Sequence, residues 1–274
     1  MAVRNLPKVK KWVRFPSLAH KNRAGKIFSS RLKYKTYLMN KLNIGWFTTG
    51  AGEAASQLFD VVYKAIRRGE IKAEISFAFF NRALGESKKT DRFINKIKKL
   101  GIPVVAFSFR KFLPGLRKKD LKQWRKKYDL EIYKRTKNFK ADIIMLAGYM
   151  LILDKDLCRK YTMLNLHPAL PNGPTGNWKK VTREIIEGRK KEHGVMIHIT
   201  TEKLDRGPVV TYCKFRVNRF NFWEIRKKDV RYELPLIKKT LKLIASGDIK
   251  IKNKKVFLKG KPCPNGCELK IKPR

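Results

Sequence analysis

Three polar side chains with complementary chemistry stand beside sharp turns in the sequence. Asn165 and His167 alternate at the end of the apolar stretch Tyr161–Leu166, which Pro168 follows, and Asp205 comes later, also at a break. Proline lacks an N–H and fixes φ, so the chain turns after His167. Alternation along a strand places Asn165 and His167 on one side. An imidazole facing a carboxylate, beside an amide donor, is the minimal set for proton transfer and oxyanion stabilisation. The alternative is a turn whose polar groups cap the backbone.

Apolar strands that alternate with amphipathic helices must position these residues. The apolar patterns predict strands at 42–47, 72–80, 102–107, 142–147, 161–166, 194–200 and 209–217. They predict helices at 53–68, 87–100, 111–132, 154–161, 178–187 and 229–246. This alternation predicts an α/β fold with a Rossmann-like, doubly wound and mostly parallel sheet. Open sheets of this kind hold ligands at the carboxyl ends of their strands.

A glycine-rich turn, Thr48–Gly52, joins the first predicted strand to the first predicted helix. A strand, a glycine turn and a helix offer backbone N–H groups and the positive end of the helix dipole to a phosphate. The motif alone is weakly specific, and it is also compatible with an ordinary connection.

Several segments in register carry a resemblance to a known family. They are Asp142–Leu153, Asn165–Pro171, His193–His198 and Leu204–Val209. With these segments the chain resembles the folate-dependent formyltransferases from about residue 42 to about residue 250. The resemblance implies a formyltransferase domain at 42–250 and transfer of a formyl group from 10-formyltetrahydrofolate to an amine. Within the family the match is nearest to the branch that formylates glycinamide ribonucleotide in purine biosynthesis.

The resemblance also implies roles for individual residues. The catalytic residues would be Asn165, His167 and Asp205. The residues that contact the folate would be Arg125, Met150, Leu151, Ile152, Leu153 and Asn165. The residues that contact the amine substrate would be Gly50, Gly52, Glu53, Ala54 and His198.

The phosphate turn departs from the family pattern at Glu53 and Ala54. The family reads Gly-Ser-Asn where this chain reads Gly52-Glu-Ala. A carboxylate at a helix N-terminus is stabilised by the helix dipole, but it repels a phosphate. Ser56 is a candidate substitute donor. The departure bears on the identity of the phosphorylated amine more than on the folate.

The expected chemistry is attack of the amine on the formyl carbon, with negative charge building on the formyl oxygen. Protonated His167 and the Asn165 amide would donate to that oxygen. Asp205 is expected to hold the imidazole and raise its pKa. It is also expected to accept the amine proton through a water.

Three further functions compete with this interpretation. A methionyl-tRNA formyltransferase-like enzyme shares the core, but it carries a C-terminal β-barrel domain and reads Asp where this chain has Pro208. A formyltetrahydrofolate hydrolase carries an N-terminal regulatory domain, for which residues 1–41 are too short and too basic. The remaining alternative is an RNA-binding protein on a formyltransferase core, which the positive charge favours and the complete set of three polar residues opposes.

The charge of the chain is strongly positive. It has 274 residues with 66 Lys and Arg against 22 Asp and Glu, a formal net charge of +44. Residues 1–41 form a basic extension without acidic residues, and residues 251–274 form a basic tail. Such charge predicts non-specific nucleic-acid binding, or it reflects a lysine-rich composition with solvated faces.

The four cysteines are expected to be reduced. Cys158 and Cys213 lie in apolar segments, and Cys263 and Cys267 flank a tight turn. A structural zinc site needs four ligands, and no second pair lies near that turn, so no metal is expected. The sequence has no secretory segment and no apolar run of about 20 residues. A cytoplasmic enzyme without a membrane segment is therefore predicted.

Overall fold

The computed structural model describes residues 41–273. The predicted basic extension therefore lies outside the described residues, apart from Lys41. In the described part, a main sheet of eight strands has the order β11-β7-β6-β5-β4-β1-β2-β3. Its strands are β1 (Leu42–Thr48), β2 (Ala73–Phe80), β3 (Val104–Ala106), β4 (Ile143–Leu146), β5 (Met163–His167), β6 (Glu192–Ile199), β7 (Val209–Arg216) and β11 (Cys267–Glu268).

The pairing is mostly parallel. In the described part of the main sheet, the exceptions are the β5–β6 and β6–β7 pairs, so β6 runs against its neighbours. The predicted Rossmann-like, mostly parallel α/β fold is confirmed. The central strand β4 is buried along its whole length, as expected for a strand covered on both faces.

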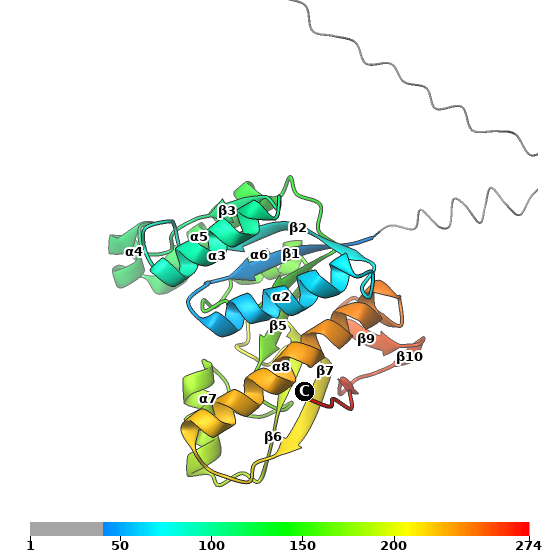
Figure 1. Cartoon of the computed structure of the whole chain (residues 1–274). Helices are drawn as coiled ribbons and strands as arrows, with labels where there is room; N and C mark the ends of the chain where they lie inside the picture. Colours follow the sequence, from blue (N-terminus) through cyan, green and yellow to red (C-terminus); the bar gives the residue numbers. More distant parts are fainter. Residues whose placement is uncertain (1–40, 274) are drawn as a thin grey trace, which may run out of the picture. The chain divides into compact units, whose positions relative to one another are not determined.

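Helices cover both faces of the sheet (Figure 1). One apolar cluster joins the sheet to α2 (Glu53–Arg67), α3 (Lys88–Lys99), α7 (Trp178–Glu187) and α8 (Phe222–Ala245). A second cluster joins the opposite face to α4 (Pro114–Lys119), α5 (Leu121–Thr136) and α6 (Lys155–Lys160). The two clusters make three layers, and α2 lies against α8.

The helix α8 begins well before the predicted start at Asp229. The side chain of Asn221 caps it by accepting the backbone N–H groups of Trp223 and Glu224. The first turns carry Arg226 and Asp229, which pair with charged groups. The apolar periodicity that marks the rest of the helix is therefore missing from its start.

The described residues of the predicted basic tail add strands to the domain. β8 (Ile249–Lys252), β9 (Lys255–Leu258) and β10 (Lys261–Pro262) form an antiparallel sheet. The final strand, β11, pairs parallel with β7 and extends the main sheet. No helix of the described residues is long and apolar enough to span a membrane.

Candidate active site

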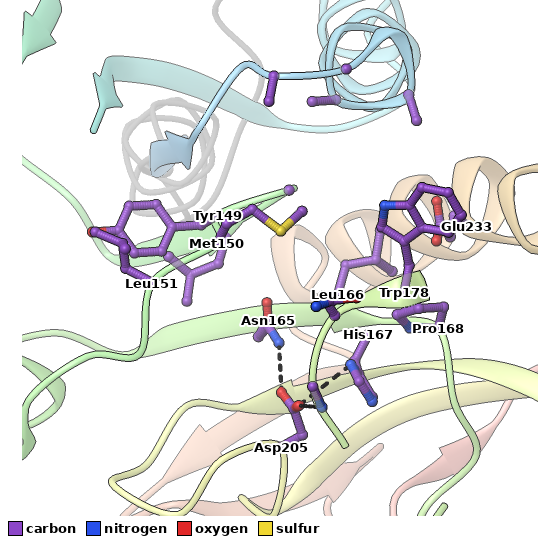
Figure 2. A pocket seen from close by; sticks show the side chains of 18 of the residues that line it. Tyr149, Met150, Leu151, Asn165, Leu166, His167, Pro168, Trp178, Asp205 and Glu233 are labelled. Atoms are coloured by element: carbon purple, nitrogen blue, oxygen red, sulfur yellow. Dashed lines mark hydrogen bonds and ion pairs between the residues drawn. The ribbon is translucent and has the colours of Figure 1, made fainter. Parts of the chain in front are cut away.

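A cavity of about 730 Å³ opens at the carboxyl ends of the central strands, where sequence analysis places the ligand site. Asn165 and His167 line its middle, with Asp205 beneath them (Figure 2). Tyr149 and Met150 border one end, and Trp178 and Glu233 the other. We call these the loop end and the indole end.

Asp205 is the centre of the polar network. Its Oδ2 accepts the backbone N–H of Gly176 at 2.8 Å and lies 3.7 Å from Nδ1 of His167. Its Oδ1 accepts from Nδ2 of Asn165 at 3.3 Å and lies 3.5 Å from Nε2 of His198. The structure therefore brings together the three predicted catalytic residues and His198.

Backbone geometry explains why these groups meet. Asn165 and His198 are direct partners in the antiparallel β5–β6 ladder, and Nδ2 of Asn165 lies 3.1 Å from Nε2 of His198. Asp205 adopts a left-handed conformation, with φ of 52°, which aspartate tolerates better than most residues. A Cβ at Gly207 would lie 1.7 Å from the carbonyl oxygen of Ile199. Only glycine allows this approach, which brings the Asp205 turn onto β6.

Burial changes the pKa expected for His167. His167 is 2% exposed, and burial lowers its pKa more than Asp205 and the Pro174 carbonyl raise it, so the pKa lies below its usual value. The expected rise of the His167 pKa is therefore wrong, because removal of the imidazole from water outweighs the carboxylate beside it. Burial raises the pKa of Asp205, but contacts with His198, His167 and Gly176 outweigh it and hold this pKa below its usual value. A neutral imidazole beside a carboxylate results at neutral pH.

The imidazole of His167 is held through Nε2, while Nδ1 faces Asp205. Its Nε2 lies 2.9 Å from the carbonyl oxygen of Pro174, so the neutral ring carries its proton there. Its Nδ1 then faces Asp205 without a proton. This arrangement allows Nδ1 to take up a proton next to a carboxylate that stabilises the charge formed.

The loop end is built by the segment that follows β4. Gly148 has φ of 69°, which favours glycine, and the backbone N–H of Met150 donates to Oγ1 of Thr49 at 3.0 Å. Met150 is 52% exposed although apolar. All four predicted folate residues of this loop, Met150, Leu151, Ile152 and Leu153, line the cavity. Ile152 is also exposed, so the loop presents more than one apolar side chain beside the cavity, a feature of ligand-binding grooves.

Arg125 is not among the residues that line the cavity. It lies half-buried on α5, one turn before Asp129. The Asp129 carboxylate accepts the backbone N–H of Asp154 at the end of the loop. Burial raises the pKa of Asp129 to about 7. In this structure α5 therefore meets the loop end through Asp129.

Only some of the residues predicted to contact the amine substrate in the turn after β1 line the cavity. Gly52 and Ala54 line the cavity, while Gly50 and Glu53 do not. Gly52 caps α2 without a side-chain hydrogen bond. The hydroxyl of Ser56 accepts from Nζ of Lys96, and Ser56 does not line the cavity, so it supplies no substitute donor there.

Sequence analysis missed the indole end. Arg226 donates from Nη1 to Oε1 of Glu233 at 2.8 Å and from Nη2 to Oε2 at 3.4 Å. Its Cζ lies 5.0 Å from the ring centre of Trp178. Behind the pair, Oδ1 of the buried Asp229 lies 3.1 Å from Nε2 of His193. The spacing of Arg226, Asp229 and Glu233 on one helical face was the available signal.

The described residues contain no group of three or more metal-ligating side chains close enough to hold an ion. The C-terminal cysteines lie together, with Sγ of Cys267 2.8 Å from Sγ of Cys263. Neither thiol lines the cavity.

The chain is similar in sequence to proteins of one known family. A family described as formyl transferase matches residues 47–221. Phosphoribosylglycinamide formyltransferase of Haemophilus influenzae is 26% identical over 209 residues, which cover 74% of this chain and 89% of that protein. The enzyme of that name from Dictyostelium discoideum is 28% identical over 178 residues, 61% of this chain and 80% of that protein.

A solved structure has the same architecture. The phosphoribosylglycinamide formyltransferase of Coxiella burnetii aligns with a TM-score of 0.69 at 23% identity, covering 84% of this chain and 100% of that chain. At this identity the likeness shows a shared fold.

Proposed function

The chain belongs to the formyl transferase family, and we propose that it transfers a formyl group from 10-formyltetrahydrofolate to the primary amine of glycinamide ribonucleotide. The single observation that supports this most strongly is the convergence of Asn165, His167 and Asp205 in the middle of the cavity. The names of the relatives support the acceptor, since they act as phosphoribosylglycinamide formyltransferases.

The loop end suits the folate. The exposed Met150 and Ile152 present apolar surface to a flat ring, and the family resemblance implies that the backbone of Met150–Leu153 contacts the pteridine. The cavity volume of about 730 Å³ falls within the range of sites that hold a ligand of this size. The indole end then receives the acceptor, and the transferred carbon lies between them near Asn165.

The reaction makes and breaks one C–N bond. The acceptor nitrogen attacks the formyl carbon, charge builds on the formyl oxygen, and the bond from that carbon to N10 of the folate breaks. The amine loses one proton and N10 gains one. The products are the formamide and tetrahydrofolate.

Each residue of the polar network has its own role in this reaction. The Asn165 amide donates to the formyl oxygen as its charge develops. Nδ1 of neutral His167 accepts the proton of the attacking amine, and the Asp205 carboxylate stabilises the imidazolium. The same nitrogen then returns the proton to N10. Asp205 also orients Asn165 by accepting from its Nδ2.

The decisive assay incubates the purified full chain with 10-formyltetrahydrofolate and glycinamide ribonucleotide and follows release of tetrahydrofolate. We expect turnover that requires both compounds. Turnover with charged initiator tRNA but not with glycinamide ribonucleotide contradicts the proposal. Nucleic-acid binding through the basic surface, and a cytoplasmic location, stay predictions.

A further inference from the structure

The small sheet of β8, β9 and β10 has one apolar face and one basic face. Directly opposite residues of an antiparallel pair point to the same face, and neighbours along a strand point to opposite faces. Ile251 lies opposite Val256, and Lys250 lies opposite Phe257. The inward residues pack into the first apolar cluster, and they are Ile249, Ile251, Val256 and Leu258. The outward face therefore carries the lysines of β8 together with the ring of Phe257.

Phe257 is an aromatic residue on β9, the middle strand of this sheet (Figure 1). It is half-buried, and it is not among the described residues that form either apolar cluster. Its cross-strand neighbours are Lys250 on β8 and Pro262 on β10, and both are exposed. A phenyl ring in this position offers a flat apolar surface to a partner.

The charge around this ring is positive. No acidic residue occurs between Asp248 and Glu268. The same stretch contains six exposed lysines, which are Lys250, Lys252, Lys254, Lys255, Lys259 and Lys261. The two flanking carboxylates have other partners, since Glu268 lies 3.6 Å from Lys214 and Asp248 accepts from the Ser246 hydroxyl. Lys252 lies directly opposite Lys255, where like charges repel, so a bound anion would relieve that repulsion.

The positive surface continues from the turn between β8 and β9 into a hollow of about 320 Å³. Lys254, in that turn, lines the hollow together with basic residues of α6 and of the loop after β6, which are Lys155, Arg159, Lys203 and Arg206. Among the described residues that line it, Glu202 alone is acidic. A chain of phosphates that crosses the sheet can therefore meet further cations beside it.

The two hairpin turns distinguish between kinds of polyanion. One turn contains Asn253 and Lys254, and the other contains Lys259 and Gly260. A segment that binds a lipid surface buries apolar side chains in it, and these tips offer none. Single-stranded nucleic acid is bound by a basic surface with an aromatic side chain on which a base stacks. The outward face of the sheet has both features.

We propose that the outward face of the β8–β10 sheet binds single-stranded nucleic acid. One base stacks on Phe257, and the neighbouring phosphates pair with the exposed ammonium groups of Lys250, Lys252 and Lys255. These four residues are not among the described residues that line the cavity of the candidate active site. Binding at this surface is therefore independent of formyl transfer.

Fluorescence anisotropy of a labelled oligouridylate of about 12 nucleotides measures this binding to the purified full chain. Lys250→Gln, Lys252→Gln and Lys255→Gln together should lower the steepness of log affinity against log salt by about 2, as for three lost phosphate contacts. The charge-matched control replaces three exposed lysines of α4 and α5 by Gln, namely Lys118, Lys122 and Lys126. It should change the affinity by less than about threefold. Equal losses in both triple variants overturn the proposal, because net charge alone then explains the binding.

Phe257→Leu keeps an apolar side chain but removes the ring. The affinity should fall about tenfold, as for one lost base-stacking contact, with the salt dependence little changed. Phe220→Leu is the matched control, because Phe220 is an exposed aromatic residue outside this sheet. All variants are compared at a temperature at which thermal unfolding shows them to be folded. An unchanged affinity in Phe257→Leu overturns the proposal.

Two further probes test the class of partner. We expect weaker binding of an RNA duplex of the same length, because its bases are already stacked, and weaker binding of phosphatidylserine-containing vesicles. Equally tight binding of either probe, lost in Phe257→Leu, overturns the assignment to single strands. A thiouridine-containing oligouridylate should also cross-link within residues 250–262. Cross-links confined to residues 1–40 overturn the proposed location.

Discussion

The carboxylate of Asp205 accepts the backbone N–H of Gly176 at 2.8 Å. This bond joins the turn after β6 to the loop after β5, which also carries Pro174, the partner of His167. One carboxylate therefore contacts the His167 imidazole, the Asn165 amide and a loop of the cavity wall. A substitution that removes both carboxyl oxygens of Asp205 should consequently affect the chemistry and the shape of the site together.

Asp205→Asn should lower turnover at least about 100-fold, because the carboxamide keeps the shape but no longer stabilises an imidazolium. The measurement is tetrahydrofolate release at saturating substrates. Asp156→Asn, half-exposed on α6, is the control and should retain full activity. Near-normal turnover of Asp205→Asn would remove the carboxylate from the mechanism.

The pH dependence of kcat should reflect a neutral His167. Burial lowers the pKa of its imidazole below 6.5, and the proposed proton acceptor is the neutral ring. Turnover at saturating substrates should therefore fall as pH drops below that lowered pKa and stay level from about pH 6.5 to 8. A rate that instead falls as pH rises through this range would show that the imidazolium is the active form.

Asp129→Asn should alter the pH dependence of stability. Burial raises the pKa of Asp129 to about 7, so between pH 4 and 7 the folded protein holds a proton that the unfolded chain has released. The free energy of unfolding therefore decreases as pH rises in this window, by up to about 1.4 kcal/mol per pH unit. Asn keeps an oxygen for the Asp154 N–H but does not titrate.

Urea unfolding of both proteins at pH 5, 6 and 7 measures this effect. The variant should show a shallower decline, though not a flat one, because burial also raises the pKa of Asp229, to about 6. Equal slopes for Asp129→Asn and the parent chain would contradict the assignment.

Gly207→Ala should destabilise the protein by about 2–3 kcal/mol, since the new Cβ would lie 1.7 Å from the Ile199 carbonyl oxygen and overpacking strains the backbone. Gly115→Ala is the matched control, because Gly115 lies in α4 and has no atom within 4 Å of an added Cβ. Thermal unfolding compares the two. Gly115→Ala should be neutral or slightly stabilising, and an equal loss in both variants would refute the steric explanation.

Side-chain donors added to the turn after β1 should strengthen binding of the acceptor's phosphate. Glu53→Ser combined with Ala54→Asn removes a carboxylate and adds a hydroxyl and an amide near the cavity. The ratio of kcat/KM for the ribonucleotide to that for the ribonucleoside should rise about tenfold, as for one added hydrogen bond to a charged group. Glu74→Ser removes an exposed carboxylate on β2 and should leave the ratio unchanged.

Sequence reasoning located most of the site because its signals are local. Pro168 marks the end of β5 after His167, and Gly148 marks the loop that carries Met150. Strand ends of a parallel sheet share one edge, so the alternating pattern also predicted that these residues converge. The start of α8 and the added strands of the tail escaped prediction, because charged residues and short strands disturb the apolar periodicity.

The amino-acid sequence by itself determined the fold class, the family and the positions of Asn165, His167 and Asp205, since these follow from periodicity, turn residues and motif order. The tertiary structure decided what depends on distance and burial. It placed Arg125 outside the cavity wall, reversed the expected pKa shift of His167, and paired Arg226 with Glu233 against Trp178. The pKa of His167 and the contact between Trp178 and Arg226 arise from groups that meet only after the elements pack, so the sequence does not reveal them.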